Sequence, residues 1–355
     1  MEKEQLQQIL TAFGLTFQEI TSFYDTSHGE EDRRLNYILD NAYVLKIHSL
    51  RSIWEERLQE INRLIERYRS IGVYCPKLIP TLSGSLSCPY ELDGVMHTCF
   101  VEEYAMYPVC SDEMQLDRKE VVSHLGILAG KYSGVDLSEI YNMWSMIELS
   151  PLDMEYGEDE KQCTANMLIE ALENANLPEL ANNVTAFNDR LRNEIQKDFR
   201  KLPRCVYQGD LNSTNFLHKD GHFAGLIDFN LSGTDVNINE FVNETNWFPT
   251  TEEFDTLTVP EILDSIDRKQ AEVLEVILAN YTLNELEQHL LPYYKGICDL
   301  FQYPNVCLMM KWLQDDTRKE KAVCLIQGLL QKVYFFGRNQ IPETVSCCGF
   351  RDFLI

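Results

Sequence analysis

The chain has 355 residues, of which 45% are hydrophobic, so it can bury a large core in about two domains. Its 56 acidic residues outnumber its 31 basic residues and give a formal net charge of −25. Such a surface repels nucleic-acid backbones and anionic lipid headgroups, so we expect neither nucleic acid nor a membrane as a partner. Solubility is the simplest role of this charge, although the same field could concentrate a cationic small molecule.

Cysteine usage and the N-terminal segment indicate the compartment. The chain has eleven cysteines, an odd number, and no Cys-x-x-Cys pair, which favours a reducing environment over a disulfide framework. The first residues, MEKEQLQQIL, are charged and amphipathic and do not resemble a signal peptide. The chain also lacks a run of about 18 apolar residues that could cross a membrane. We therefore expect a cytoplasmic protein.

The first strands are expected on either side of a short polar turn at residues 27–34. This turn contains a single glycine and begins with Ser27. Residues 36–47, NYILDNAYVLKI, predict the second of these strands and a third one, which meet at a turn, and Lys46 lies inside the third. A lysine inside an apolar strand is costly unless its charge is paired, so Lys46 is either an edge residue facing water or a functional residue.

The next element is predicted to be a helix. Ser52-Ile53-Trp54-Glu55 matches a capping box, and apolar residues then recur at helical spacing until Ile71-Gly72. Glu56 and Glu60 lie one turn apart on one flank of this helix, and either could pair with Lys46. We prefer Glu60, which lies deeper in the helix.

The rest of the chain is mostly helical in pattern. Residues 98–104, TCFVEEY, predict a strand that is broken at Ala105-Met106-Tyr107-Pro108. Beyond it, the hydrophobic spacing predicts helices at 114–132, two within 160–200, one at 261–281, one that opens with a capping box at 282–285, and one at 321–336.

Residues 206–233, VYQGDLNSTNFLHKDGHFAGLIDFNLSG, carry the most specific pattern. Asp210 lies in a turn, Asn215 follows, an Asp-Gly pair predicts a hairpin, and the returning strand ends at Asp228. An ionised Asp210 can accept a hydroxyl proton, and Asn215 and Asp228 offer the oxygen ligands that Mg²⁺ prefers. Kinases combine these same parts. The alternative is an ordinary hairpin with polar surface residues.

This segment resembles the motif of the aminoglycoside phosphotransferase and choline kinase-like family, which runs His-Gly-Asp, four residues, Asn, and then Ile-Asp-Phe or Ile-Asp-Leu. Gln208 stands where the family has a loop-bracing histidine, and glutamine can also donate and accept hydrogen bonds. Gly233-Thr234-Asp235 resembles the Gly-x-Asp that follows in the family. The chain matches the motif itself at Gly209, Asp210, Asn215, Ile227 and Asp228.

The resemblance implies a two-lobed protein kinase-like α+β fold. Residues 1–104 would form a small N-lobe with an antiparallel sheet and one helix, and residues 105–355 a larger, mostly helical C-lobe. The acceptor would bind helical regions at about 140–200 and 250–350. The implied activity is that of a phosphotransferase, which moves the γ-phosphoryl group of ATP or GTP to a hydroxyl of a small, possibly cationic, acceptor in the presence of Mg²⁺.

The resemblance also assigns roles to residues of the catalytic segment. Asp210 would orient the acceptor hydroxyl and take its proton, and Asn215 and Asp228 would hold Mg²⁺. Because the transition state of phosphoryl transfer is largely dissociative, positioning by these groups matters more than the strength of the base.

Residues of the N-lobe and its border would hold the nucleotide. Lys46, paired with Glu60, would contact the phosphates, and Ser27 with the backbone of its turn would cover them. Main-chain groups of Glu103 and Ala105 would bond the adenine edge, so their side chains do not distinguish ATP from GTP.

Three alternatives remain open. The acceptor could be choline, a sugar, homoserine or methylthioribose, because the helices that build acceptor pockets vary within the family. A non-catalytic pseudokinase that binds nucleotides or partners is slightly favoured by Gln208 and by the glycine-poor turn. It is disfavoured by the presence of all four residues Lys46, Asp210, Asn215 and Asp228. A kinase acting on proteins is disfavoured, because the chain has no Gly-x-Gly-x-x-Gly loop and no Ala-Pro-Glu segment after Asp228.

Overall fold

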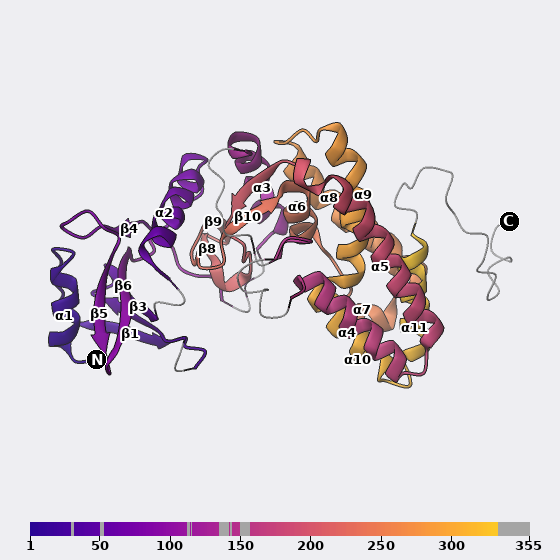
Figure 1. The fold of residues 1–355 in the computed structure, drawn as a ribbon, viewed down its shortest axis with the longest axis horizontal. Helices are drawn as coiled ribbons and strands as arrows, with labels where there is room; N and C mark the ends of the chain where they lie inside the picture. Colours follow the sequence, from indigo (N-terminus) through magenta and orange to yellow (C-terminus); the bar gives the residue numbers. More distant parts are fainter. Residues whose placement is uncertain are drawn as a thin grey trace.

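The computed structural model describes residues 1–29, 32–49, 53–111, 114, 116–134, 142, 144–149 and 157–332. A β-sheet with two helices occupies one end of the molecule, and a helical assembly occupies the other (Figure 1). Two short hairpin-like sheets lie between these parts, beside helix α3 (Figure 1). The polar motif of the sequence belongs to this middle region.

The N-terminal sheet has six strands, and every pairing in it is antiparallel. Buried and half-buried residues alternate along its second strand, as expected for a sheet with two unlike faces. Asp40 and Asn41 adopt positive φ values of 53° and 51°, which lets the chain turn tightly between the second and third strands. The strand order is β1 (Ile20–Asp25), β2 (Arg34–Leu39), β3 (Tyr43–Ser49), β6 (Val95–Glu103) and β4 (Leu78–Ile79), with β5 (Ser87–Leu92) also paired to β6.

Two helices pack against this sheet, so the prediction of a single helix beside it is wrong. The apolar residues Leu6, Ile9 and Leu10 of α1 (Lys3–Thr11) pack in one cluster with Ile47 and Val101 of the sheet. Helix α2 (Glu55–Ser70) packs instead in a cluster with Phe100, which neighbours Val101 on β6 and therefore points to the other face.

The start of α2 differs from the sequence prediction. The helix begins at Glu55 with Trp54 as its N-cap, and no side chain caps it. The carboxylate of Glu55 accepts a hydrogen bond from the main-chain N–H of Leu86 at 3.0 Å. It therefore binds the segment that connects β4 to β5 and does not cap the helix. The predicted capping box is therefore wrong in its Glu55 half, and Ser52 lies outside the described residues.

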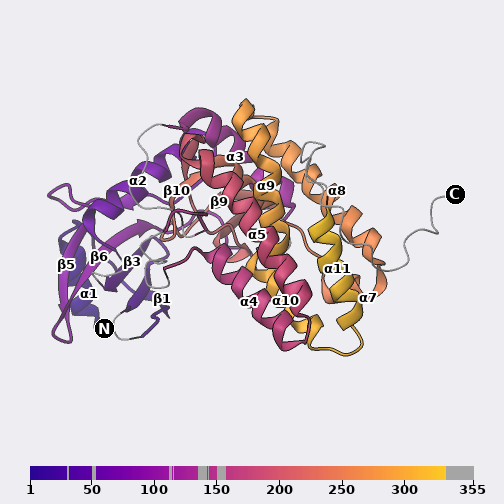
Figure 2. The ribbon, with the colours of Figure 1, turned by 45° about the vertical axis from the view of Figure 1, so that its right-hand side comes forward.

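Beyond the sheet, the described chain is mainly helical. A large core of buried aliphatic and aromatic residues joins these helices, and α4, α5, α9 and α10 run close together (Figure 2). The helices are α3 (Arg118–Tyr132), α4 (Glu160–Asn174), α5 (Pro178–Asp198), α6 (Asn237–Thr245), α7 (Thr251–Thr256), α8 (Val259–Leu278), α9 (Glu285–Phe301), α10 (Tyr303–Leu313) and α11 (Lys319–Gln331).

Two predicted helix starts lie elsewhere in the structure. Helix α3 begins at Arg118, because the carboxylate of Asp117 accepts from Lys119 N–H and caps it there. The capping box before α9 is formed by Asn284 and Glu287, two residues later than predicted. Helix α11 ends at Gln331. Residues 333–336 of the predicted segment lie outside the described residues.

The middle region holds the predicted hairpin. Strands β8 (Phe216–Lys219) and β9 (His222–Leu226) pair across Asp220 and Gly221, whose φ values are 52° and 85°. The Asp-Gly prediction is confirmed, because both residues have the positive φ that a tight turn requires. Strands β7 (Arg204–Tyr207) and β10 (Gly233–Val236) form a second antiparallel pair. Among the described helices, none is long and apolar enough to cross a membrane.

Candidate active site

The two strand pairs of the middle region bring together the polar residues of the loops that leave their ends. Asp210 follows β7, Asn215 ends a short 3₁₀ turn before β8, and Asp228 follows β9. The main-chain N–H of Ile227 donates to the carbonyl of Asn215 at 3.0 Å, which ties the outgoing arm to the returning arm. Gly209 makes this packing possible, since a Cβ there would lie 2.4 Å from the carbonyl oxygen of Leu231 and its φ is +80°.

The carboxylate of Asp210 is held by two neighbouring amides. Asn215 Nδ2 donates to Asp210 Oδ2 at 2.8 Å and to the Asp210 carbonyl at 3.0 Å, and Asn212 Nδ2 donates to Oδ1 at 2.7 Å. Burial raises the pKa of Asp210, the two amide donors oppose that rise, and the nearby charge of Asp228 adds to it. The carboxylate is therefore oriented and made more basic than an aspartate in water.

Gln208 joins the two acidic residues of the site. Its side chain is fully buried. The amide nitrogen donates to the carbonyls of Ile227 at 3.2 Å and of Asp228, and the amide oxygen accepts from Asp210 N–H at 2.7 Å. The main-chain N–H of Gln208 donates to Tyr68 Oη at 3.1 Å, which connects the loop to α2. A glutamine thus braces this loop with both ends of its side chain.

Asp228 and Asn215 are the residues that could hold a metal ion. Asp228 is exposed, adopts a φ of +56° and accepts from Asn230 N–H at 3.3 Å. The amide nitrogen of Asn215 donates to Asp210, so the Oδ1 atom of Asn215 is the one that could bind a cation. This donor set suits Mg²⁺, which usually takes one or two protein oxygens and completes its shell with phosphate and water. Among the described residues, no cluster of three or more His, Cys, Asp or Glu offers a protein-only metal site.

Lys46 of β3 is near enough to Asp228 for that carboxylate to affect its pKa. Burial would lower its pKa, but the charges of Glu102 and Asp228 outweigh that effect and raise the pKa overall. The lysine is therefore charged and lies close enough to Asp228 to feel its field. The structure thus brings together Lys46, Asp210, Asn215 and Asp228, which the sequence places up to 182 residues apart, from 46 to 228.

The predicted partner of Lys46 is wrong. Lys46 Nζ lies 2.9 Å from Glu102 Oε1, whereas Glu60 pairs with Arg57 at 3.1 Å. The physical reason is sheet register. Lys46 is opposite Phe100 on β6, so Glu102, two residues along, points to the same face as a diagonal neighbour. Glu56 is likewise not the residue to which Lys46 is paired.

Ser27 lies in the turn between β1 and β2, Glu103 is the last residue of β6, and Ala105 comes two residues later. Ser27 Oγ donates to Asp25 Oδ1 at 2.5 Å and accepts from Arg34 N–H at 2.9 Å, so its hydroxyl shapes the β1–β2 turn. Glu103 N–H donates to the Lys77 carbonyl at 2.9 Å, so this N–H is already used within the N-terminal part of the chain. Ala105 follows the end of β6, as the predicted strand break implies.

Other residues act on the site that the sequence patterns did not single out. Asn212 lies inside the motif and bonds Asp210, and Trp144 Nε1 donates to the carbonyl of Gly209. The buried guanidinium of Arg57 donates to Asn230 and Ser232, just beyond Asp228. Residue alternation along β6 could have indicated Glu102, but neither Arg57 nor Trp144 stands in a recognisable pattern.

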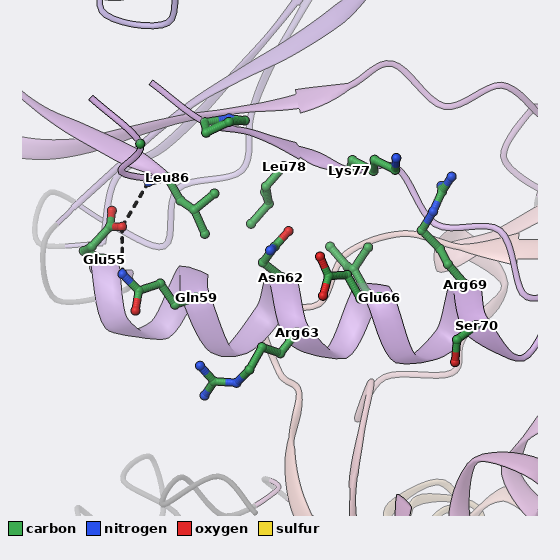
Figure 3. Close-up of a pocket in the computed structure, with 13 residues that line it drawn as sticks. Glu55, Gln59, Asn62, Arg63, Glu66, Arg69, Ser70, Lys77, Leu78 and Leu86 are labelled. Atoms are coloured by element: carbon green, nitrogen blue, oxygen red, sulfur yellow. Dashed lines mark hydrogen bonds between the residues drawn. The ribbon is translucent and has the colours of Figure 1, made fainter. Parts of the chain in front are cut away.

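A cavity of about 890 Å³ lies elsewhere, between α2 and the β4–β5 segment. Glu55 bonds Leu86 at one end of it, and Lys77 and Arg69 lie toward the other (Figure 3). None of Lys46, Asp210, Asn215 and Asp228 lines this cavity. This cavity is therefore separate from the candidate active site.

Comparison with known proteins supports the kinase-like arrangement. The family model described as the phosphotransferase enzyme family (APH) matches residues 26–256, which is more than half of the chain. No curated protein matches the chain.

Two solved structures are similar along almost their whole length. One is a microcompartment-associated aminopropanol kinase, at 13% identity over 93% of this chain and 95% of that one, with a TM-score of 0.50. The other is the amicoumacin kinase hAmiN in complex with AMP-PNP, Ca²⁺ and Ami, at 13% identity over 94% of each chain, with a TM-score of 0.51. These likenesses confirm the predicted α+β kinase-like fold.

Proposed function

Because the chain belongs to the phosphotransferase enzyme family, we propose that it moves the γ-phosphoryl group of ATP or GTP to a hydroxyl group of a small acceptor. Family membership makes the chain a small-molecule phosphotransferase. The nucleotide, the metal, the residue roles and the acceptor are our proposals.

One observation carries the assignment of residues. Gln208 bonds both the main-chain N–H of Asp210 and the main-chain carbonyl of Asp228, and the charge of Asp228 contributes to the raised pKa of Lys46 and of Asp210. A phosphate-binding cation, a metal-binding carboxylate and a base are therefore within electrostatic reach of one another. Phosphoryl transfer requires that combination, because its catalysis rests on positioning and on charge stabilisation.

In the proposed reaction, each of the four polar residues of the site has its own role. Asp210, oriented by Asn212 and Asn215, orients the acceptor hydroxyl and receives its proton. Lys46 binds the phosphates of the nucleotide. Asn215 and Asp228 would hold Mg²⁺, which when bound offsets the phosphate charge.

We further propose that the nucleotide lies between an N-lobe of residues 1–104 and a C-lobe of residues 105–355. The sheet then supplies Lys46 and the Glu103 carbonyl, and Ala105 supplies its N–H to the base. The middle region supplies the catalytic loop. The regions at about 140–200 and 250–350 would bind the acceptor, and in the first of them Trp144 donates to the carbonyl of Gly209, next to Asp210.

A hydroxylated, cationic acceptor fits this chain best. The net charge of −25 favours the approach of cations, and one structural neighbour is named as a kinase of aminopropanol, an amino alcohol. Choline, sugars, homoserine and methylthioribose remain candidate acceptors. A pseudokinase role loses one of its two supports, because Gln208 makes the bracing contacts that the loop needs. We also propose a cytoplasmic location, because the odd number of cysteines and the lack of a Cys-x-x-Cys pair favour a reducing environment.

A nucleotide-release screen tests this proposal. ATP and GTP are each supplied with Mg²⁺ and with a panel of hydroxylated amines, neutral sugars and amino acids. We expect acceptor-dependent NDP release with at least one hydroxylated amine, and none with the matching deoxy compound. Binding of Mg-ATP without release for any acceptor would instead support the pseudokinase.

A further inference from the structure

The lysine of the candidate site is placed by the sheet. Lys46 Nζ and Glu102 Oε1 are 2.9 Å apart, and the two side chains are only 12% and 19% exposed. Strands β3 and β6 are adjacent and antiparallel, with Val44 opposite Glu102 and Lys46 opposite Phe100. Main-chain hydrogen bonds between the strands therefore set the spacing of this ion pair, whatever the position of α2.

The surroundings of the pair support a fixed geometry. Lys46 Nζ also lies 5.7 Å from the centre of the Phe100 ring, within the range of a cation–π contact. Burial and the nearby charge of Lys46 lower the pKa of His48, on the same face of β3, to about 3. His48 is therefore neutral at neutral pH and adds no second positive charge beside Lys46.

Helix α2 makes a different connection. Arg57 is 4% exposed, and its guanidinium donates to the carbonyl and hydroxyl of Ser232, the latter at 2.9 Å, and to the Asn230 carbonyl at 3.3 Å. Glu60 accepts from the same guanidinium at 3.1 Å. A buried cation is costly without such acceptors, so this contact ties α2 to the segment directly after Asp228.

We propose that Glu102 is a positioning residue that holds Lys46 toward the nucleotide phosphates, while Arg57 of α2 positions the segment that carries Asp228. The inference rests on the proposed function, because Lys46 must meet a nucleotide. In protein kinases the strand lysine pairs with a glutamate of the helix, so helix placement controls the lysine. In this chain the two tasks are divided between β6 and α2.

The test compares Glu102→Gln, Glu102→Asp, Glu60→Gln and Arg57→Lys, with Glu66→Gln as a charge-matched control on the exposed face of α2. Mg-ATP affinity is measured by calorimetry, which needs no acceptor, and NDP release gives kcat and the Mg²⁺ concentration for half-maximal rate. We expect Glu102→Gln to weaken ATP binding about tenfold, the size of one charge-assisted hydrogen bond, and to lower kcat. Glu102→Asp should recover part of the loss.

We expect Glu60→Gln and Arg57→Lys to have the same effect as each other, and to change the Mg²⁺ requirement more than the affinity for ATP. Both should raise the Mg²⁺ requirement and change ATP affinity less than Glu102→Gln does, and Glu66→Gln should behave as the wild type. Thermal unfolding of each variant verifies that it is folded, and Glu102→Asp, which keeps the charge, serves if Glu102→Gln unfolds.

Two results would overturn the inference. One is unchanged or tighter ATP binding by Glu102→Gln, which would make Glu102 a competitor of the phosphates. The other is a loss of ATP affinity in Glu60→Gln at least as large as in Glu102→Gln. Failure of the proposed function would give another result, because the wild type itself would then neither bind Mg-ATP nor release NDP.

Discussion

Gln208 donates its side-chain amide to the main-chain carbonyl of Asp228, and this contact joins the two halves of the catalytic segment. The oxygen of the same side chain accepts from Asp210 N–H at 2.7 Å. Glutamine at position 208 thus forms a brace between the two acids. It also makes that brace independent of pH, because an amide does not titrate in the physiological range.

The first prediction concerns this brace. Gln208→Ala leaves the buried Asp210 N–H without its acceptor, and each such loss costs about 1–3 kcal/mol. We expect a lower thermal midpoint and a kcat reduced roughly 100-fold, because small displacements of catalytic groups are that costly. Gln208→His should retain activity at neutral and alkaline pH and lose it in acid, where imidazolium cannot accept. If Gln208→Ala keeps the wild-type kcat at a lowered midpoint, Gln208 has a purely structural role.

The second prediction concerns the base. Asp210→Asn is close to isosteric and leaves an oxygen for the Asn215 amide, but it cannot take a proton. We expect kcat to fall by about 10²–10⁴, the usual contribution of a general base, with little change in Mg-ATP affinity or thermal midpoint. The assay is acceptor-dependent NDP release together with calorimetric ATP binding. Turnover at the wild-type rate would remove Asp210 from the mechanism.

The third prediction concerns the metal. Asp228 and Asp220 both adopt positive φ, at 56° and 52°, a conformation that asparagine tolerates well. Asp228→Asn should therefore fold and should lose both turnover and the stabilisation by Mg-ATP. Asp220→Asn, in the hairpin turn, is the matched control and should retain both. ATP-dependent turnover in Asp228→Asn, or in wild type after complete chelation of divalent cations, would contradict the metal assignment.

The fourth prediction uses the pH profile of kcat. Burial raises the pKa of Asp210, and the Asn212 amide partly opposes the rise. Since the base must be ionised, activity falls as pH falls through that pKa. Asn212→Ala removes a hydrogen bond that lowers the pKa, so the acidic limb of the profile should move to higher pH. A shift to lower pH, or none, would show that Asp210 does not control this limb.

The fifth prediction concerns Asp235 and stability. Burial raises its pKa to about 6, against hydrogen bonds from Ser145, Asn239 and Val236. Between its unfolded value of 3.8 and about 6, the folded chain holds a proton that the unfolded chain has lost. The contribution of this carboxyl to stability is thus most favourable below pH 4 and declines by about 3 kcal/mol as pH rises through 6.

Asp235→Asn should flatten that decline. The measurement is the free energy of unfolding by urea at a series of pH values between 4 and 7, with Asp189→Asn on the exposed face of α5 as the charge-matched control. An Asp235→Asn variant with the same slope as the wild type would show that Asp235 does not hold its proton in the folded chain.

Much of the site follows from short stretches of sequence. The Asp-Gly turn, the strand that returns to Asp228 and the close positions of Asp210 and Asn215 all depend on neighbours within about twenty residues. Backbone preferences of those residues suffice to place them, since an Asp-Gly pair favours the positive φ of a hairpin turn. For the same reason, the strand that carries Lys46 and the strand break before Ala105 were predicted correctly.

The tertiary structure decided the contacts between distant segments. Lys46 meets Glu102 because β6 pairs with β3 in one register, and that register depends on which side chains the two faces of the sheet must bury. Arg57 meets Ser232 because α2 packs against the middle region, across 175 positions of sequence. Local patterns favoured Glu60, which lies on a suitable helix, but a charged group pairs with whichever opposite charge the packing brings nearest.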